Sequence, residues 1–206
     1  LVELLYPKVQ QALQKLSGVE KAKAAVFAAL RAVRSFAGAF KLSIGEYGLS
    51  VDPEAGVADS GNLEYDLSDL FLKVGEAAKS AGKGWTLLID EVQYLDEAEL
   101  AALIVAIHKC NQRTLPVLFF GAGLPQVAAL SGDAKSYAER LFSYPNIGPL
   151  DPASARAAIR RPIEDEGNAI LDSALDAIIE ATHRYPYFLQ EWGYQSWNLA
   201  KQSPIG

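Results

Sequence analysis

Two adjacent acids, Asp90 and Glu91, are the residues of this sequence best suited to chemistry. They close a short apolar run, residues 85–89, which is typical of a buried parallel strand. Open α/β sheets bind their ligands at the carboxyl ends of the strands. We therefore expect both acids to lie at the edge of a crevice. The structural alternative is a core strand followed by an acid that caps a helix.

The segments around this run predict alternating helices and strands. Helical spacing of apolar residues predicts a helix that begins near Leu63 and ends at Gly82 and Gly84. Asp96 and Glu99 form a capping-box pattern for a helix through about Gln112. The buried side of that helix is expected to be Leu100, Leu103, Ile104 and Ile107. A second strand is expected at 116–120, and this order is typical of a parallel sheet.

The rest of the chain is predicted to be mainly helical. Short helices at 124–130 and 135–142 precede a brief third strand at 146–150. Beyond Asp151 all elements are expected to be helices. Asp151-Pro152 caps the first, Asp172 starts the next, and Pro186 starts the last. Its core residues are expected to be Phe188, Trp192 and Leu199.

The first quarter of the sequence carries no residues suited to chemistry. Helices are predicted at 1–16 and 19–37, a hairpin at 40–51 and a loop at 52–62. We interpret this part as an accessory insertion or arm. Basic residues exceed acids up to Lys41, and acids predominate in residues 42–99; a solvated helix surface explains this better than a nucleic-acid face.

Composition limits the class of protein. Half of the 206 residues are hydrophobic, enough for a sizeable core, and no apolar run reaches the roughly 20 residues that a membrane-spanning helix needs. No secretory signal opens the chain, and the single Cys110 suits a reducing cytoplasm, where we expect it to be an inert buried thiol. The sequence contains no methionine, so we expect it to be part of a longer protein.

Three other kinds of chemistry find no support. His108 and His183 have no Cys or acid partners at metal-ligand spacing, and His108 is interpreted as structural. No Gly-x-Ser-x-Gly elbow of a serine hydrolase occurs. A sequence-specific DNA-binding domain is disfavoured because the net charge is −6 and no recognition-helix pattern occurs.

Several segments in order resemble an AAA+ ATPase of the origin-recognition and STAND-like branch. The resemblance spans about residues 63–200. It rests on the segments 87–95, 115–123, 137–142, 147–150 and 185–189. It implies a partial P-loop NTPase fold of the α/β class, with a parallel sheet, flanking helices and a helical lid subdomain. The expected divisions are 1–62 (arm and hairpin), 63–150 (AAA+ core) and 151–206 (lid).

The resemblance also implies roles for individual residues. Asp90 and Glu91 match the Walker B acids, so Asp90 is expected to bind Mg²⁺ through water and Glu91 to orient the attacking water. Gln93 matches the Asp-Glu-x-Gln variant of this branch. Arg140 matches the position of an arginine finger, with a surface ion pair as the alternative. Pro186 matches the start of the lid helix that faces the adenine.

Three departures from the family pattern weaken nucleotide chemistry in this chain. Arg184 stands where the family has glycine, and residues 121–123 lack the polar sensor residue. No Gly-x-x-x-x-Gly-Lys-Ser/Thr loop exists in the sequence, and such a loop is the main source of triphosphate binding. In the family sheet the missing P-loop strand would leave a gap between the strands at 116–120 and 146–150. We expect other residues, a swapped partner strand or rearrangement to fill it.

The functional prediction follows from these matches and departures. The chain is expected to be part of a cytoplasmic ATP-binding and ATP-hydrolysing AAA+ type protein that couples turnover to partner or DNA remodelling. Alone it should not hydrolyse ATP or bind ATP and Mg²⁺ tightly. Expected partners are a second copy or the missing N-terminal segment, another protein, and DNA through a missing C-terminal domain, but no membrane. The alternative is a non-catalytic interaction or oligomerisation module on a degenerate AAA+ scaffold.

Overall fold

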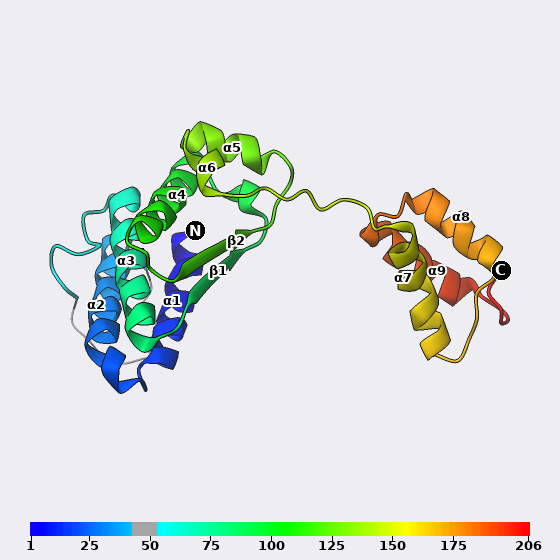
Figure 1. Ribbon diagram of the computed structural model, residues 1–206, viewed down its shortest axis with the longest axis horizontal. Helices are drawn as coiled ribbons and strands as arrows, with labels where there is room; N and C mark the ends of the chain where they lie inside the picture. Colours follow the sequence, from blue (N-terminus) through cyan, green and yellow to red (C-terminus); the bar gives the residue numbers. More distant parts are fainter. Residues whose placement is uncertain (43–52) are drawn as a thin grey trace. The chain divides into compact units, whose positions relative to one another are not determined.

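The structure, a computed structural model, describes residues 1–42 and 53–206 (Figure 1). The chain divides into two compact units, Leu1–Tyr144 and Pro145–Gly206, which are described separately below. Most of the hairpin predicted at 40–51 lies outside the described residues.

The first unit combines helices with a two-stranded parallel sheet (Figure 1). Its elements are α1 (Val2–Leu16), η1 (Glu20–Ala22), α2 (Lys23–Ala39), α3 (Leu63–Ala81), β1 (Trp85–Ile89), η2 (Val92–Tyr94), α4 (Glu97–Gln112), β2 (Val117–Gly121), α5 (Val127–Ala134) and α6 (Ala138–Leu141). β1 and β2 pair in parallel, from Trp85 opposite Val117 to Ile89 opposite Gly121. The predicted order of helix, strand, helix and strand and the parallel pairing are confirmed. This arrangement fits an α/β fold.

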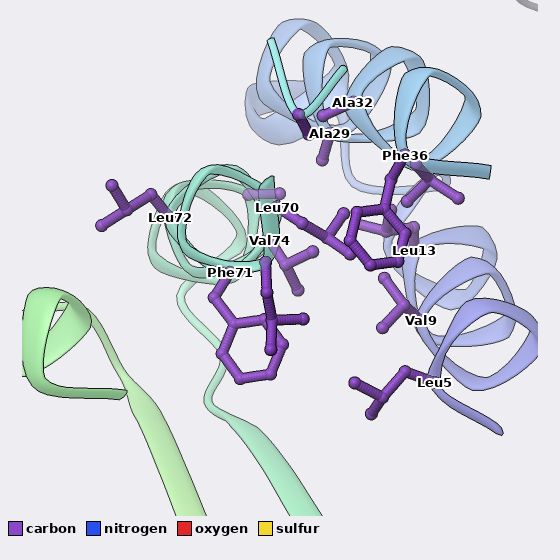
Figure 2. Close-up of a cluster of buried hydrophobic side chains, with 14 of the residues drawn as sticks. Leu5, Val9, Leu13, Ala29, Ala32, Phe36, Leu70, Phe71, Leu72 and Val74 are labelled. Atoms are coloured by element: carbon purple, nitrogen blue, oxygen red, sulfur yellow. The ribbon is translucent and has the colours of Figure 1, made fainter. Parts of the chain in front are cut away.

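The core of the first unit is built around α3. Figure 2 shows side chains of α1, α2 and α3 meeting in one cluster, with Phe36, Leu70 and Phe71 among them. These three side chains are completely buried. Because α1 and α2 share this core with α3, α4 and the sheet, the core crosses the predicted division at residue 62.

Local signals in the sequence fix the ends of the two helices next to the sheet. The Asn62 side chain accepts a hydrogen bond from the Tyr65 N–H at the start of α3. Gly82 ends this helix in the left-handed conformation, at φ +67°. The capping box of Asp96 and Glu99 starts α4 as predicted. The four residues predicted to form the buried side of α4 are all buried, so this prediction is confirmed.

Among the described residues of the first unit, one face of the sheet is covered. Leu87 is buried and belongs to the same core as α3 and α4. On the opposite face Leu88 is 75% exposed, and Leu118 and Phe120 are more than half exposed. The prediction of a fully buried strand at 85–89 is therefore wrong for this face. An apolar run does not by itself reveal whether both faces of its strand are covered.

The second unit is a small helical unit with its own core. It contains α7 (Pro152–Asp165), α8 (Asp172–Thr182) and α9 (Pro186–Leu199). The predicted helix starts at Pro152, Asp172 and Pro186 are confirmed. The buried residues that hold the unit together are Ala155, Ile159, Ile163, Ile170, Leu175, Ile178, Leu189 and Ile205.

Two predictions for residues 145–206 are wrong. Residues 146–150 form no strand; they include Gly148 and Pro149 and pair with neither β1 nor β2. On α9, Phe188 and Trp192 are about half exposed and Leu199 is 75% exposed, so they are not core residues. The helix buries Leu189 instead and places Gly193 against Ile159. Since the predicted third strand is absent, the gap expected beside it stays untested.

In the described ranges 1–42 and 53–206 we find no helix with the length and apolar character needed to cross a membrane.

Candidate functional site

Asp90 and Glu91 lie directly after β1, at the carboxyl edge of the sheet, and both are exposed. The segment after β2 holds this end of β1 in place. The Ala122 N–H donates to the Ile89 carbonyl at 2.9 Å, and the Val92 N–H donates to the Ala122 carbonyl at 2.9 Å. The two acids therefore lie beside the loop that follows the neighbouring strand, at the carboxyl edge of the sheet. The crevice expected there stays a prediction.

Glu91 has an unusual backbone conformation. Its φ of +56° and ψ of +44° put it in the left-handed region, which costs a non-glycine residue about 1–2 kcal/mol. The Asp90 Oδ1 accepts a hydrogen bond from the Glu91 N–H at 2.9 Å and supports this turn. Residues held in such conformations cluster at functional sites.

Gln93 joins Glu91 to the loop after β2. Its Nε2 donates to the Glu91 Oε2. Its Oε1 accepts a hydrogen bond from the Leu124 N–H at 3.1 Å. Both ends of the Gln93 amide are therefore engaged, one by the acid and the other by the loop.

Gly123 allows the close approach of this loop to Gln93. A Cβ atom at position 123 would lie 2.6 Å from the Gln93 Oε1 and 2.8 Å from the Val127 Cγ2. Sequence reasoning treated residues 121–123 only as a loop without a sensor residue and missed this role. The available signal was a glycine two residues after the end of a strand, which can indicate close backbone approach.

Arg140 lies in the short helix α6 and is exposed. Among the described residues, no acid lies within 4.0 Å of its guanidinium, so the surface ion pair considered as an alternative is not found there. The hydrogen bonds and ion pairs of the described ranges do not connect Arg140 with Asp90 or Glu91. Its role as an arginine finger stays a prediction.

Pro186 is the first residue of α9, in the second unit, and Asp90 belongs to the first. Pro186 lines an apolar pocket of about 560 Å³ between α7 and α9, together with Ile159, Leu189 and Trp197. Just before it, Arg184 has a φ of +63°, which glycine adopts without strain.

The sequence predicted that Asp90 binds a magnesium ion through water, and this stays a prediction. In the part of the chain that the structure describes, no three His, Cys, Asp or Glu side chains cluster as metal ligands would. Mg²⁺ keeps several waters and uses only one or two protein carboxylates. In the described part of the chain no hydrogen bond or ion pair engages the Asp90 Oδ2, and Asp90 is an exposed residue, so this oxygen is available to such an ion.

Comparisons with protein-family models, with curated proteins and with solved structures found no match for this chain.

Proposed function

We propose that residues 63–200 belong to an ATP-binding and ATP-hydrolysing protein of the AAA+ type. The observation that carries this proposal is the pair of adjoining carboxylates at the carboxyl edge of two parallel strands, with Glu91 in a left-handed conformation. Glu91 stands at the N-cap of η2, but its side chain makes no capping hydrogen bond there. The cap of α4 is provided by Asp96. Ligands of open parallel sheets bind at this edge.

Each acid has a distinct role in the proposed reaction. Asp90 holds a hydrated Mg²⁺ through its free carboxylate oxygen. Glu91 orients the attacking water and accepts its proton. When bound, Mg²⁺ would neutralise the charge that develops on the phosphate oxygens during phosphoryl transfer. Arg140 is proposed to stabilise the same charge in a neighbouring copy.

The phosphate-binding half of the site must come from outside residues 1–206. The sequence has no Gly-x-x-x-x-Gly-Lys-Ser/Thr loop, whose N–H groups would cradle the phosphates. We therefore expect the 206-residue chain alone to have no ATPase activity. A form of the protein that carries such a loop is proposed to couple ATP turnover to the remodelling of a protein partner or DNA.

The test is Mg²⁺-dependent ATP hydrolysis by a form of the protein that contains a phosphate-binding loop. Replacing Glu91 by Gln removes the general base, and we expect kcat to fall by about 100-fold or more. The matched control is Glu97→Gln, an exposed acid in the first turn of α4, which should leave kcat unchanged. Full activity of Glu91→Gln would overturn the assignment.

A second candidate function is a non-catalytic interaction module on the same scaffold. The bare apolar face of the sheet, with Leu88, Leu118 and Phe120, favours it because exposed apolar patches mark contact surfaces. Nucleotide binding separates the two candidates. Calorimetric titration with ATP and Mg²⁺ should show a specific site in the loop-containing ATPase, whereas the interaction module should show none.

A further inference from the structure

We propose that Gln93 is a positioning residue that ties the Glu91 carboxylate to the loop after β2, so that the position of this loop sets the position of the carboxylate. The tether itself follows from the geometry of the described residues. Its consequence for hydrolysis rests on the function proposed above.

The orientation of the Gln93 amide is fixed by its two partners. The Leu124 N–H can only donate, so it requires the amide oxygen of Gln93. The ionised Glu91 carboxylate can only accept, so it requires the amide nitrogen. Turning the amide over would break both hydrogen bonds together. The side chain therefore acts as one link with a defined direction, from the loop to the acid.

The backbone around this link leaves the loop little freedom to move independently. The Val92 N–H donates to the Ala122 carbonyl at 2.9 Å, one residue before the side-chain contact. Gly123 lies so close to Gln93 that a single added Cβ atom would collide with the amide oxygen at 2.6 Å. Residues 91–93 and 122–124 are thus joined by both backbone and side-chain bonds, although 31 positions separate Gln93 from Leu124.

The consequence concerns the orientation of Glu91 rather than nucleotide affinity. Glu91 is exposed, so without the amide its carboxylate is free to occupy several rotamers. A displacement of about 1 Å in a catalytic group is enough to reduce the rate strongly. Loss of Gln93 should therefore lower kcat and leave KM nearly unchanged. A displacement of the loop at 122–124 should have the same effect.

The first experiment measures the tether without any activity. In the 206-residue chain, amide hydrogen exchange of Leu124 is followed by NMR. Gln93→Leu removes the acceptor of the Leu124 N–H, so we expect exchange at least tenfold faster than in the wild type. Gln93→Asn, one methylene too short to reach both partners, should behave in the same way. Gln126→Leu, an exposed glutamine nearby, is the matched control and should leave this exchange unchanged.

An exchange of the two side chains separates the tether from general packing. Gln93→Glu alone places two carboxylates together and should accelerate Leu124 exchange at least tenfold. When Glu91→Gln is added, the new amide at position 91 can donate to the new carboxylate at position 93. That carboxylate still accepts from the Leu124 N–H. The double variant should return to within about threefold of the wild-type exchange rate. Unchanged exchange in Gln93→Leu, or a double variant no better than Gln93→Glu, would overturn the tether.

The second experiment measures hydrolysis in a form that contains a phosphate-binding loop. Gln93→Leu should lower kcat about tenfold and keep KM within about twofold. The double variant should restore Leu124 protection but not hydrolysis, because its acid has moved to position 93. An unchanged kcat in Gln93→Leu would refute the positioning role. If the exchange results hold but Glu91→Gln keeps full activity, the proposed function fails and the tether stands.

Discussion

The local features of the candidate site are the left-handed backbone of Glu91 and the two hydrogen bonds of Gln93. Asp90 and Glu91 were predicted at a strand end because an apolar run followed by acids is a local pattern. The left-handed backbone of Glu91 was not predicted, since a Glu carries no sequence signal for it, unlike a Gly. The Gln93–Leu124 bond was also missed because it joins segments that only the fold brings together.

Cys110 illustrates how burial controls the chemistry of one side chain. The thiol is buried on α4, and burial raises its pKa from 9.0 to about 12. The prediction of a buried cysteine is confirmed. Because the thiolate is the nucleophile, a thiol with this pKa is unreactive near neutral pH.

We therefore predict slow alkylation of native Cys110. At pH 8.5 its reaction with iodoacetamide should be on the order of 100-fold slower than in urea-unfolded chain, as measured by mass spectrometry. The unfolded thiol also loses its proton first as the pH rises. The stability contribution of Cys110 is thus complete below about pH 9 and is lost toward pH 12, a loss absent from Cys110→Ala. Equal alkylation rates in the two states would contradict the burial.

At the scale of elements, the ends of the helices beside the sheet were predicted correctly. The buried face was predicted correctly for α4 but not for α9. The capping box of α4 and the glycine end of α3 depend on neighbouring residues, and both are confirmed. The prediction of the buried side of α9 was wrong because aromatic residues occur around most of this helix, so its sequence does not single out one face. Which face is buried depends on α7 and α8, and the sequence of α9 carries no information about them.

Phe71 of α3 is predicted to be a main stabilising residue of the first unit. It is completely buried, and its ring meets the Trp85 ring edge-on at a centroid distance of 4.9 Å. Phe71→Ala should lower the free energy of unfolding by about 3–5 kcal/mol in urea titrations followed by circular dichroism. Tyr65→Ala, on the same helix but 63% exposed, is the control and should cost far less. A cost below about 1 kcal/mol for Phe71→Ala would contradict this packing.

The N-terminal cap of α7 predicts an acid-sensitive helix. Hydrogen bonds from Ser154 hold the pKa of Asp151 below its usual value, with a smaller contribution from the Ala153 N–H. A lowered folded-state pKa means that the stabilisation is present above about pH 3.9 and is lost as the pH falls through the folded-state value. Asp151→Asn keeps an acceptor without the charge.

The stability difference between wild type and Asp151→Asn should therefore shrink as the pH falls below about 4. Thermal unfolding followed by circular dichroism measures it. Asp165→Asn, an exposed acid at the other end of α7, is the control. This change leaves the capping bonds of Asp151 in place, so the stability difference that depends on them should not appear. A difference that stays constant from pH 6 to pH 2 would contradict the cap.

At the scale of the whole molecule, the chain forms two units whose cores share no residue. The sequence indicated the change from mixed elements to helices at Asp151, because Asp-Pro is a strong local start signal. The strand predicted at 146–150 does not form. A strand needs a partner strand, and in the described residues this segment has none. It also contains Gly and Pro, which disfavour strand pairing.

Among the described residues, the segment between the units is predicted to be the first site of proteolysis. Ile147 is 91% exposed, and no backbone hydrogen bond is recorded for residues 143–149 in the described chain. Proteases bind extended backbone, and such exposed segments are cut before packed helices are. Thermolysin, which cleaves before large apolar residues, should cut the Asn146–Ile147 bond early. Both products should keep helical circular dichroism because each retains its own core. Ile147→Asp should remove this cut and leave other cleavages unchanged, whereas a bond that survives until global unfolding would contradict the division into two units.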